Sequence, residues 1–407
     1  MERFEFPIKI LTPIWTAGSS GKPEGLKMSG VMGSMRHAFE MLVRKHGGHT
    51  CNITGTDATK RCNYANNKKI CPACRLFGCT GLSSAFKIVL DLDTVKVVFP
   101  ETDKYLPNRD HNNKPYNTPP SIDTWLATII KGGDTIHPEN HDIAKQEIKN
   151  LALAFSTDET KIKILGMREW SSEISLESLL KSLFLFMSRY SGLGAKVRQG
   201  WGQFEIPNTT YDRKREEEIF KRLIEERPFH STDWDKDLPN AKDCFFKEFE
   251  ISNNELGFKW PRDEECRDRF KCVGFGLQYA LRRQIKFFGS PSYSQQKGLP
   301  ITNEWRSIRL QGKWNTVLWK EAIAFTRALF GRDEASDKDK QAGLIGVSHV
   351  YKDGNQSKIK LFGHIPEKGM YDGKVYNWDK DKIKNFVITE FEKNLRKRAP
   401  GSRRIEK

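Results

Sequence analysis

The first fifty residues change from the periodicity of a strand to that of a helix. Apolar and polar residues alternate through FEFPIKILTPI (residues 4–14), which predicts a β-strand. A helical spacing follows over residues 31–46, in which Arg36, Glu40 and Arg44 share the polar side. The apolar stripe of this predicted helix consists of Val31, Met35, Ala38, Phe39, Leu42 and Val43.

The rest of the first half adds strands and a second helix. AFKIVLDL, VKVVF and KIKILGM have the composition of strands, and the five-cysteine segment 49–80 shows little periodicity. Ser175 is a good N-cap for a strongly apolar helix that runs to about Tyr190. A glycine-rich segment, GLGAKVRQGWGQFEI (Gly192–Ile206, called the glycine loop), then leads into a short strand.

The second half echoes this order. A charged, exposed helix is expected over residues 211–227, followed by helices at 274–288 and 315–329, strands at LIGVSHVY and KIKLFGHI, and a helix over 380–398. GSMRHAFEMLVRKHGG and GLQYALRRQIKFFGS share glycine borders, an apolar stripe and basic residues, and Leu-Phe-Gly follows each. We therefore predict a duplicated unit, with domains at 1–208 and 209–407.

Charge narrows the classes of function. The 407 residues carry 68 Lys and Arg against 52 Asp and Glu, a net charge of +16, which favours a polyanionic partner such as nucleic acid. The start of the chain lacks the apolar core of a signal peptide, so a cytoplasmic location is expected. Its eight cysteines are then expected to be thiols or metal ligands.

Four cysteines of the segment 49–80 have a spacing that suits a metal. Cys71-Pro-Ala-Cys74 can place two thiolates on one tetrahedral zinc, and Cys51 and Cys62 can complete a closed, structural site. The alternative is a set of reduced cysteines without metal, which the wide spacing of Cys51 and Cys62 leaves open.

The glycine loop suggests a phosphate contact. It fits neither the Walker A pattern nor a dinucleotide-binding fingerprint. Lys196 and Arg198 could bind phosphate oxygens, backbone amides could approach a ligand, and Trp201 could stack on a base. The alternative is a tight helix-to-strand connection without a ligand.

No catalytic constellation is visible. His37 has no obvious partner in sequence, and His111, His137 and His141 lack a metal-ligand spacing. We expect no catalytic residue.

Three motifs in order resemble a known family. KPEGLKMSGVMGSMRHAFEMLVRKHGG, CPACRLFGCTGLSSAFKI and the glycine loop resemble the RAMP superfamily of CRISPR effector proteins. Their order is particularly similar to the family of the first-numbered Cmr subunit of type III-B complexes. The resemblance is specific over residues 1–207 and looser beyond.

The resemblance implies an α+β fold of two ferredoxin-like domains with antiparallel sheets, and a cysteine-rich insertion at 49–80. It implies a non-enzymatic subunit that caps a ribonucleoprotein near the 3′ end of the guide RNA, contacting guide RNA, target RNA and other Cmr subunits. Carried onto this chain, the RNA-binding residues would be Lys27, Arg36, Arg44, Lys196, Arg198, Trp201, Arg282 and Arg283.

Two other functions stay open. Some RAMP relatives are metal-independent endonucleases that process precursor guide RNA, for which His37 and Tyr190 are the candidate base and acid. A zinc-dependent DNA-binding regulator would need a recognition helix after the metal site, where the sequence after Cys79 predicts a strand.

Overall fold

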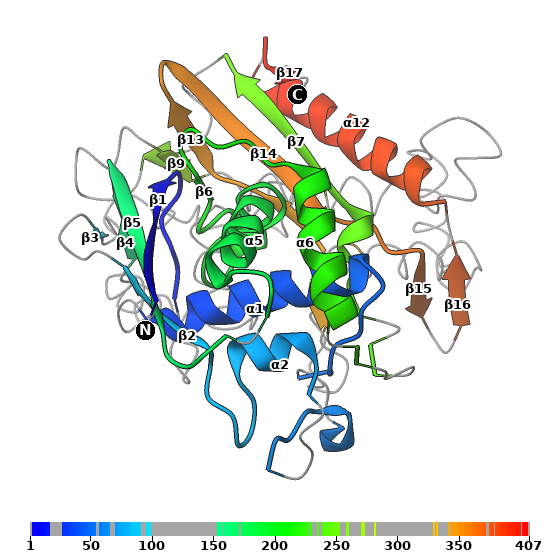
Figure 1. Ribbon diagram of the computed structural model, residues 1–407. Coiled ribbons are helices and arrows are strands. Elements are labelled where there is room, and N and C mark those ends of the chain that lie inside the picture. The colour runs from blue at the N-terminus through cyan, green and yellow to red at the C-terminus, as the bar shows by residue number, and fades with distance from the viewer. Residues whose placement is uncertain are drawn as a thin grey trace, which may run out of the picture. The chain divides into compact units, whose positions relative to one another are not determined.

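The computed structural model describes residues 2–98, 153–252 and 344–405 with short gaps, and a few residues between 258 and 342. The chain forms two compact units, whose elements are labelled in Figure 1. The first unit comprises Met1–Val98, Ala152–Val197 and Trp201–Cys244. The second comprises the described parts of Phe245–Lys407 together with Arg198–Gly200.

The first unit has a four-stranded antiparallel sheet. Its strands are β1 (Arg3–Ile10), β2 (Phe86–Leu90), β5 (Glu159–Gly166) and β6 (Phe204–Glu205), in the spatial order β2-β5-β1-β6. Central strand β1 pairs with β5 from Arg3↔Leu165 to Lys9↔Glu159. With a helix after β1 and another after β5, this order is that of the ferredoxin-like fold.

Two helices cover one face of this sheet. They are α1 (Met28–Lys45) and α5 (Leu176–Tyr190), which contact each other and lie on the same side of the strands in Figure 1. Ser175 caps α5 by accepting a hydrogen bond from the Ser178 amide, as its sequence predicts. Phe6 of β1 packs its ring 5.2 Å from that of Phe184 of α5.

The other face of the sheet is charged. Its outward side chains are Arg3, Glu5, Pro7, Lys9, Lys87, Val89, Glu159, Lys161, Lys163, Leu165 and Glu205. Lys9 pairs with Glu205 at 3.0 Å, and Lys161 pairs with Glu5 at 2.9 Å. None of these outward residues is aromatic, so this sheet offers no stacking platform for bases of the kind that RNA-binding sheets use.

The cysteine-rich insertion follows α1. It contains the 3-10 turn η1 (Ala58–Lys60) and the helix α2 (Pro72–Phe77). A small strand pair, β3 (Lys96–Val98) and β4 (Leu153–Phe155), lies between β2 and β5 in sequence.

The first unit continues beyond residue 208. Helix α6 (Arg213–Glu226) contacts α1 and α5, and the 3-10 turn η4 (Ala241–Asp243) contacts α1. The sequence predicts α6 as an exposed helix, but Glu216, Phe220 and Leu223 are buried. Buried Glu216 accepts hydrogen bonds from Lys45, His46 and Tyr211, so α6 is anchored to the end of α1 by charge as well as by apolar packing.

The second unit is built on a larger sheet. Strand order is β17-β7-β14-β13-β9-β8, with β12 also paired to β14. The bounds are β7 (Cys244–Ile251), β8 (Phe258–Lys259), β9 (Phe270–Cys272), β12 (Ile345–Val347), β13 (Val350–Asp353), β14 (Gln356–His364) and β17 (Arg403–Ile405). Two further strand pairs are β10 (Gly331–Arg332) with β11 (Gln341–Ala342), and β15 (Lys368–Tyr371) with β16 (Lys374–Asn377).

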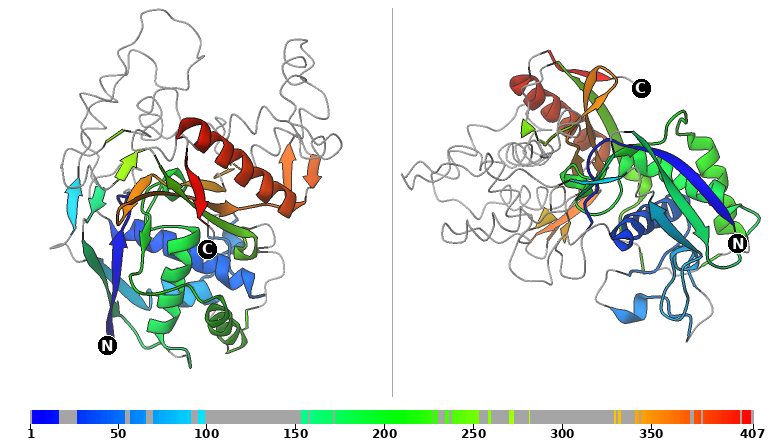
Figure 2. Two further views of the ribbon diagram at one scale, coloured as in Figure 1. Left: turned by 90° about the horizontal axis from the view of Figure 1, so that it is seen from above. Right: turned by 90° about the vertical axis from the view of Figure 1, so that its left-hand side faces the viewer.

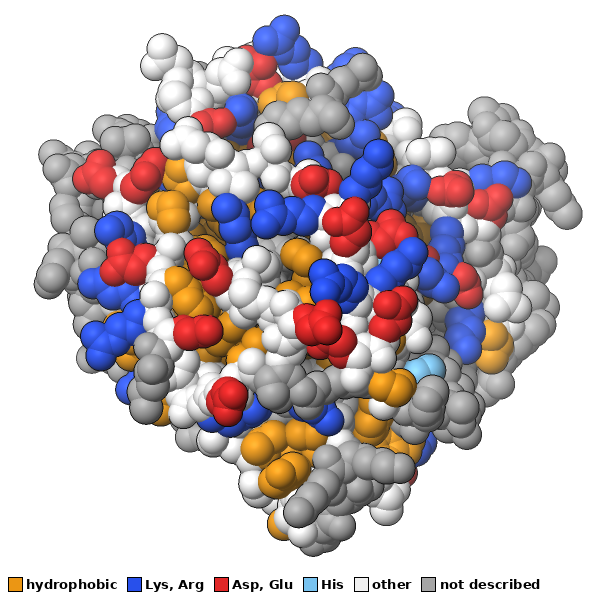
Figure 3. Space-filling model, viewed as in Figure 1, with side chains coloured by type: hydrophobic (Ala, Val, Ile, Leu, Met, Phe, Trp, Pro, Cys, Tyr) orange, Lys and Arg blue, Asp and Glu red, His pale blue; other side chains and the backbone are white. Residues whose placement is uncertain are grey.

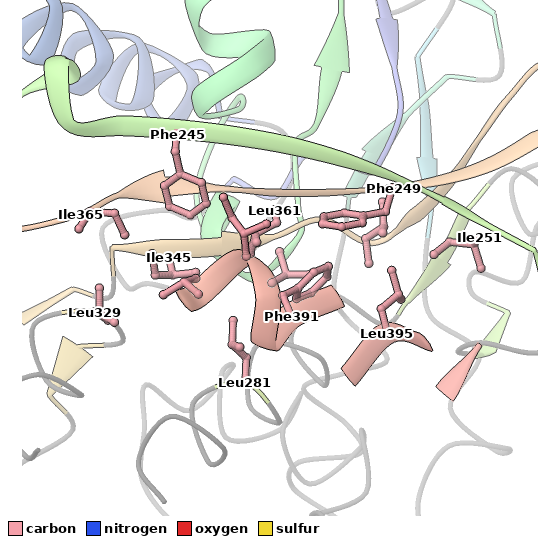
Figure 4. Packing of buried hydrophobic residues seen from close by; sticks show 14 of the residues in the cluster. Phe245, Phe249, Ile251, Leu281, Leu329, Ile345, Leu361, Ile365, Phe391 and Leu395 are labelled. Carbon is pink, nitrogen blue, oxygen red and sulfur yellow. The ribbon is translucent and has the colours of Figure 1, made fainter. Parts of the chain in front are cut away.

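Helix α12 (Lys380–Arg398) closes the core of the second unit, and its bounds agree with the expected helix. Figure 2 shows it lying along the sheet. Figure 4 shows Phe391 and Leu395 of α12 among Phe249, Leu361 and other buried side chains. The rings of Phe249 and Phe391 lie 5.1 Å apart.

The predicted fold class, α+β with antiparallel sheets and a cysteine-rich insertion, is confirmed. The expected helices at 274–288 and 315–329 fall almost entirely outside the described residues, apart from the buried Leu281 and Leu329. Among the helices that the structure describes, none has the length and apolar character needed to cross a membrane.

Candidate functional site

The insertion brings the four predicted metal ligands together. The sulfurs of Cys51, Cys62, Cys71 and Cys74 all lie within 4.8 Å of one another, and all four residues are buried. A tetrahedral zinc with bonds of about 2.3 Å places its sulfurs about 3.8 Å apart, so the cluster has the size of such a site. The cluster could bind a metal ion, and its all-thiolate donor set suits zinc.

Local structure explains how the sulfurs of Cys71 and Cys74 come together in the segment 71–74, which we call the knuckle. Cys71 is the N-cap of α2, and Pro72 occupies the first helical position, where its missing N–H costs nothing. The Cys74 amide donates to the Cys71 sulfur at 3.4 Å, and the Cys71 amide donates to the Cys62 sulfur at 3.4 Å. The Cys51 and Cys74 sulfurs are 3.4 Å apart. Cys79 is half-exposed and outside the cluster, as the sequence predicts.

The thiols perturb one another strongly. Burial raises the pKa of the Cys71 thiol well above its ordinary value. Hydrogen bonds from the Cys62, Cys71 and Cys74 thiols lower the pKa of Cys51. Bringing all four to the thiolate form requires a compensating positive charge, which a divalent metal supplies.

Arg36 points at this cluster. Its Nη2 lies 3.0 Å from the Cys74 sulfur and 3.9 Å from the Cys51 sulfur. Its Nη1 donates to the Gly78 carbonyl at 2.7 Å, and its Nε donates to Glu40 at 2.9 Å. Burial acts to lower the pKa of Arg36, but the Cys74 sulfur and Glu40 outweigh it and raise that pKa above its usual value. The sequence places this side chain toward RNA or a neighbouring subunit, whereas the structure directs it to sulfur.

Arg44 is also turned inward. Its Nη1 donates to Thr50 Oγ1 at 2.5 Å, and its Nε donates to the Pro239 carbonyl at 2.7 Å. Burial lowers the pKa of this guanidinium below its ordinary value. Glu40 and Arg44 are 6% and 8% exposed, so the polar side of α1 covers the insertion and the 235–240 segment. Arg44 therefore has a structural position, which corrects its expected role as an RNA contact.

Backbone hydrogen bonds fix the two ends of the glycine loop, at residues 193–195 and 202, which together form its base. The Leu193 amide donates to the Gly202 carbonyl at 2.8 Å, and the Gly202 amide donates to the Pro13 carbonyl at 2.8 Å. The Ala195 amide donates to the Trp15 carbonyl at 2.7 Å, and the Gly194 amide donates to Ser34 Oγ at 3.0 Å. These four amides cannot also hold a phosphate, which corrects the expectation that they approach a ligand.

Two of the glycines are required by this pairing. Gly194 has φ +87°, and a Cβ there would lie 2.4 Å from the Trp15 carbonyl oxygen. Gly202 has φ +65°, and a Cβ there would lie 1.9 Å from the Leu193 carbonyl oxygen. The glycines thus serve the helix-to-strand connection, which was the alternative explanation of the loop.

Trp201 belongs to the core. Its side chain has no exposed surface, and its ring centroid lies 5.4 Å from that of Trp15, in an edge-on arrangement. It cannot offer a face to a base, which corrects its predicted role.

Lys196 and Arg198 lie on the part of the loop between the paired glycines. Both are partly exposed, and Lys196 has the left-handed φ of +56°. Arg198 lies in the 3-10 turn η3 (Val197–Gln199). These two cations lie two residues apart in sequence, in the part of the glycine loop here called its tip.

Three other predicted RNA contacts and the two candidates for catalysis have separate positions. Lys27 precedes α1, and its amide donates to Thr16 Oγ1 at 2.8 Å. Arg282 and Arg283 lie outside the described residues.

Of the two candidates for catalysis, His37 is on α1. Tyr190 has its ring packed against Phe186 and Tyr211, and burial raises its pKa.

Figure 3 shows Lys and Arg side chains interspersed with acidic ones over the face in view. A net positive charge therefore does not make this face uniformly basic.

Comparison with known proteins finds one family model that matches the first half of the chain. Residues 7–205 match the family model described as RAMPs, the RAMP superfamily. No curated protein matches the chain at a significant level.

Three solved structures are similar over nearly the whole chain. The crystal structure of apo Cmr1 from Pyrococcus furiosus has 12% identity and a TM-score of 0.43, covering 99% of this chain and 98% of that one. The cryo-EM structure of type III-B Cmr-beta bound to cognate target RNA has 12% identity and a TM-score of 0.43, covering 96% of this chain and 99% of that one. A second Cmr-beta structure, with target RNA, AMPPnP and ssDNA present, has 13% identity and a TM-score of 0.40, covering 96% of this chain and 99% of that one. Because each TM-score is below 0.5, we base no functional assignment on these structures.

Proposed function

Since residues 7–205 match the RAMP superfamily model, we propose that the chain is a non-catalytic, RNA-binding subunit of a CRISPR effector complex. The order of its sequence motifs favours a type III-B Cmr complex, with the subunit near the 3′ end of the guide RNA. Guide RNA, target RNA and other Cmr subunits are its proposed partners, in the cytoplasm. The match to the family model is the observation that carries this proposal.

The glycine loop is the proposed phosphate contact, through Lys196 and Arg198. Its paired base holds the tip still, so binding an RNA strand there costs little ordering of the loop. Two cations can bind backbone phosphates while base pairing within the complex supplies sequence specificity. The outward face of the first sheet carries no aromatic side chain and mixes cations with anions, which makes it a poorer platform.

The cysteine cluster is proposed to be a structural zinc centre held by Cys51, Cys62, Cys71 and Cys74. Four thiolates leave no open coordination position for a substrate, so the metal would stabilise the insertion and take no part in chemistry.

Binding to a labelled, mixed-sequence single-stranded RNA tests the loop. In the double variant Lys196→Ala/Arg198→Ala we expect affinity to fall about tenfold or more, as for the loss of charge-assisted hydrogen bonds. The slope of log K against log salt should flatten by about 1.4, because each single-strand phosphate contact contributes about 0.7. The matched control is Lys221→Ala/Arg222→Ala, which removes two exposed cations of α6 that pair with Glu217 and Glu173. An equal slope in wild type and loop variant would contradict the loop as a phosphate site.

The same protein, incubated with labelled CRISPR-repeat RNA without added metal, should leave the RNA intact. Cleavage that His37→Ala abolishes would replace the binding proposal with the endonuclease alternative.

A further inference from the structure

We propose that Arg36 is the outer-sphere cation of the cysteine metal centre, and that it binds and orients the Cys74 and Cys51 thiolates instead of contacting RNA. This inference rests on the structural metal centre proposed above. It assigns the side chain a positioning role toward the metal ligands.

The N–H groups around the sulfurs form a complete set. The backbone supplies a donor to Cys62, from the Cys71 amide, and a donor to Cys71, from the Cys74 amide. Arg36 Nη2 lies 3.0 Å from the Cys74 sulfur and 3.9 Å from the Cys51 sulfur, to which the Cys62 backbone amide also donates. Each of the four ligand atoms thus has an N–H donor, and for the Cys74 sulfur that donor is Arg36.

All arms of the guanidinium are used, which fixes its direction. Nη1 binds the carbonyl of Gly78, the C-cap of α2, and Nε binds Glu40 one turn further along α1. A glycine is required at this C-cap, because residue 78 has φ +85° and a Cβ there would lie 2.8 Å from the Leu82 carbonyl oxygen. Arg36 therefore ties α1 to both the ligands and the end of the knuckle helix.

Charge favours the same assignment. A divalent metal with four thiolates is a dianionic centre, and burying it is costly unless cations lie nearby. The Arg36 side chain is 12% exposed and lies next to two of the sulfurs. It therefore supplies a positive charge at a place where little solvent can reach to stabilise the anionic centre. A lysine has one donor group in place of the planar fork, so it cannot reach Gly78, Glu40 and sulfur together.

The test follows zinc release from the full chain to a chromophoric chelator in wild type, Arg36→Met and Arg36→Lys. We expect zinc affinity to fall about 10- to 100-fold in Arg36→Met, the range found for outer-shell partners of metal ligands, with faster release. Arg36→Lys should lie between wild type and Arg36→Met, and it remains informative should Arg36→Met fail to fold.

The matched control is Arg168→Met. Arg168 donates to the backbone carbonyls of Arg75, in the same insertion, and of Ser83, just after it, but to none of the four sulfurs among its described hydrogen bonds. Its zinc release should stay within about twofold of wild type. An effect equal to that of Arg36→Met would overturn the inference, because general loosening of the insertion would then explain both.

Substituting cobalt for zinc gives a second measurement, the visible and near-ultraviolet spectrum, which would not change if Arg36 only supported the local structure. Removing the N–H donor raises the energy of the sulfur lone pairs, so the sulfur-to-cobalt charge-transfer band should shift to longer wavelength in both Arg36 variants. Wild-type protein that binds one metal, with variants of unchanged release and spectrum, overturns the role of Arg36 alone. Wild-type protein that binds no metal overturns the proposed metal centre itself, and the inference with it.

Discussion

The cysteine-rich insertion and the glycine loop differ in what their polar groups contact. The four thiols of the insertion lie together, and the Arg36 guanidinium of α1 points toward them. The glycine loop turns its amides at Leu193, Ala195 and Gly202 toward other backbone, and Lys196 and Arg198 near its tip are partly exposed. The insertion is a candidate metal site because its side chains converge, whereas the glycine loop is a candidate phosphate site only through the two cations that its hydrogen-bonded backbone carries.

Replacing Gly202 should give the largest effect. In Gly202→Ala the new Cβ would meet the Leu193 carbonyl oxygen, and the residue would be strained at its positive φ, so we expect a loss of about 4 kcal/mol or more in the free energy of unfolding. Gly47→Ala is the control, with φ +87° but nothing within 4 Å, and should cost about 1 kcal/mol. Urea unfolding measures both. Similar costs for the two variants would show that the loop is not held as described.

Removing the knuckle thiols tests the other region. In Cys71→Ser/Cys74→Ser we expect zinc to be lost and residues 49–80 to become sensitive to proteolysis, because the metal would cross-link a segment that has little regular secondary structure. Cys79→Ser removes a thiol outside the cluster and should keep both zinc and protease resistance. Retention of zinc by the double variant would contradict the ligand set.

Arg44→Met separates structural from RNA-binding cations. Removing this buried guanidinium leaves Thr50 and the Pro239 carbonyl without their donor and should cost about 3 kcal/mol of stability. The salt slope of RNA binding should not change, since the side chain is buried. A flatter slope with unchanged stability would restore Arg44 to the RNA-binding set.

Glu216, which anchors α6, should give the smallest effect. Burial favours a raised pKa, but hydrogen bonds from His46, Lys45 and Tyr211 outweigh it, so the folded-state pKa lies below the ordinary value. Its contribution to stability is therefore present above the unfolded pKa and is lost as pH falls through the folded pKa. Urea midpoints between about pH 6 and pH 3 should fall less steeply in Glu216→Gln than in wild type. Parallel curves would contradict this.

The two regions also show which parts of a site a sequence reveals. The order of strands and helices, the Ser175 cap and α12 follow from periodicity and capping, which act locally. The clustering of the four cysteines could be predicted because a metal site restricts both residue type and spacing. Neither signal says which way α1 faces, and its i, i+4, i+8 series Arg36, Glu40 and Arg44 has the pattern of a solvated side.

Tertiary packing decides the remaining residues. Trp201 is buried by Trp15, some 190 residues earlier in the chain, and the Arg44 partner Pro239 is equally remote. A possible signal for Arg36 and Arg44 is that α1 lies next in sequence to a cysteine-rich segment whose thiolates would need counter-charges. Adjacency of that kind suggests an inward role for a helix cation without identifying its partner.

The most direct test is the zinc content of the purified wild-type chain, measured by elemental analysis alongside Cys79→Ser. One zinc per chain in both proteins is predicted, with Cys51, Cys62, Cys71 and Cys74 protected from alkylation until the metal is removed. Less than about half an equivalent of zinc, with all four thiols freely alkylated, would contradict the metal centre and the position of Arg36 built upon it.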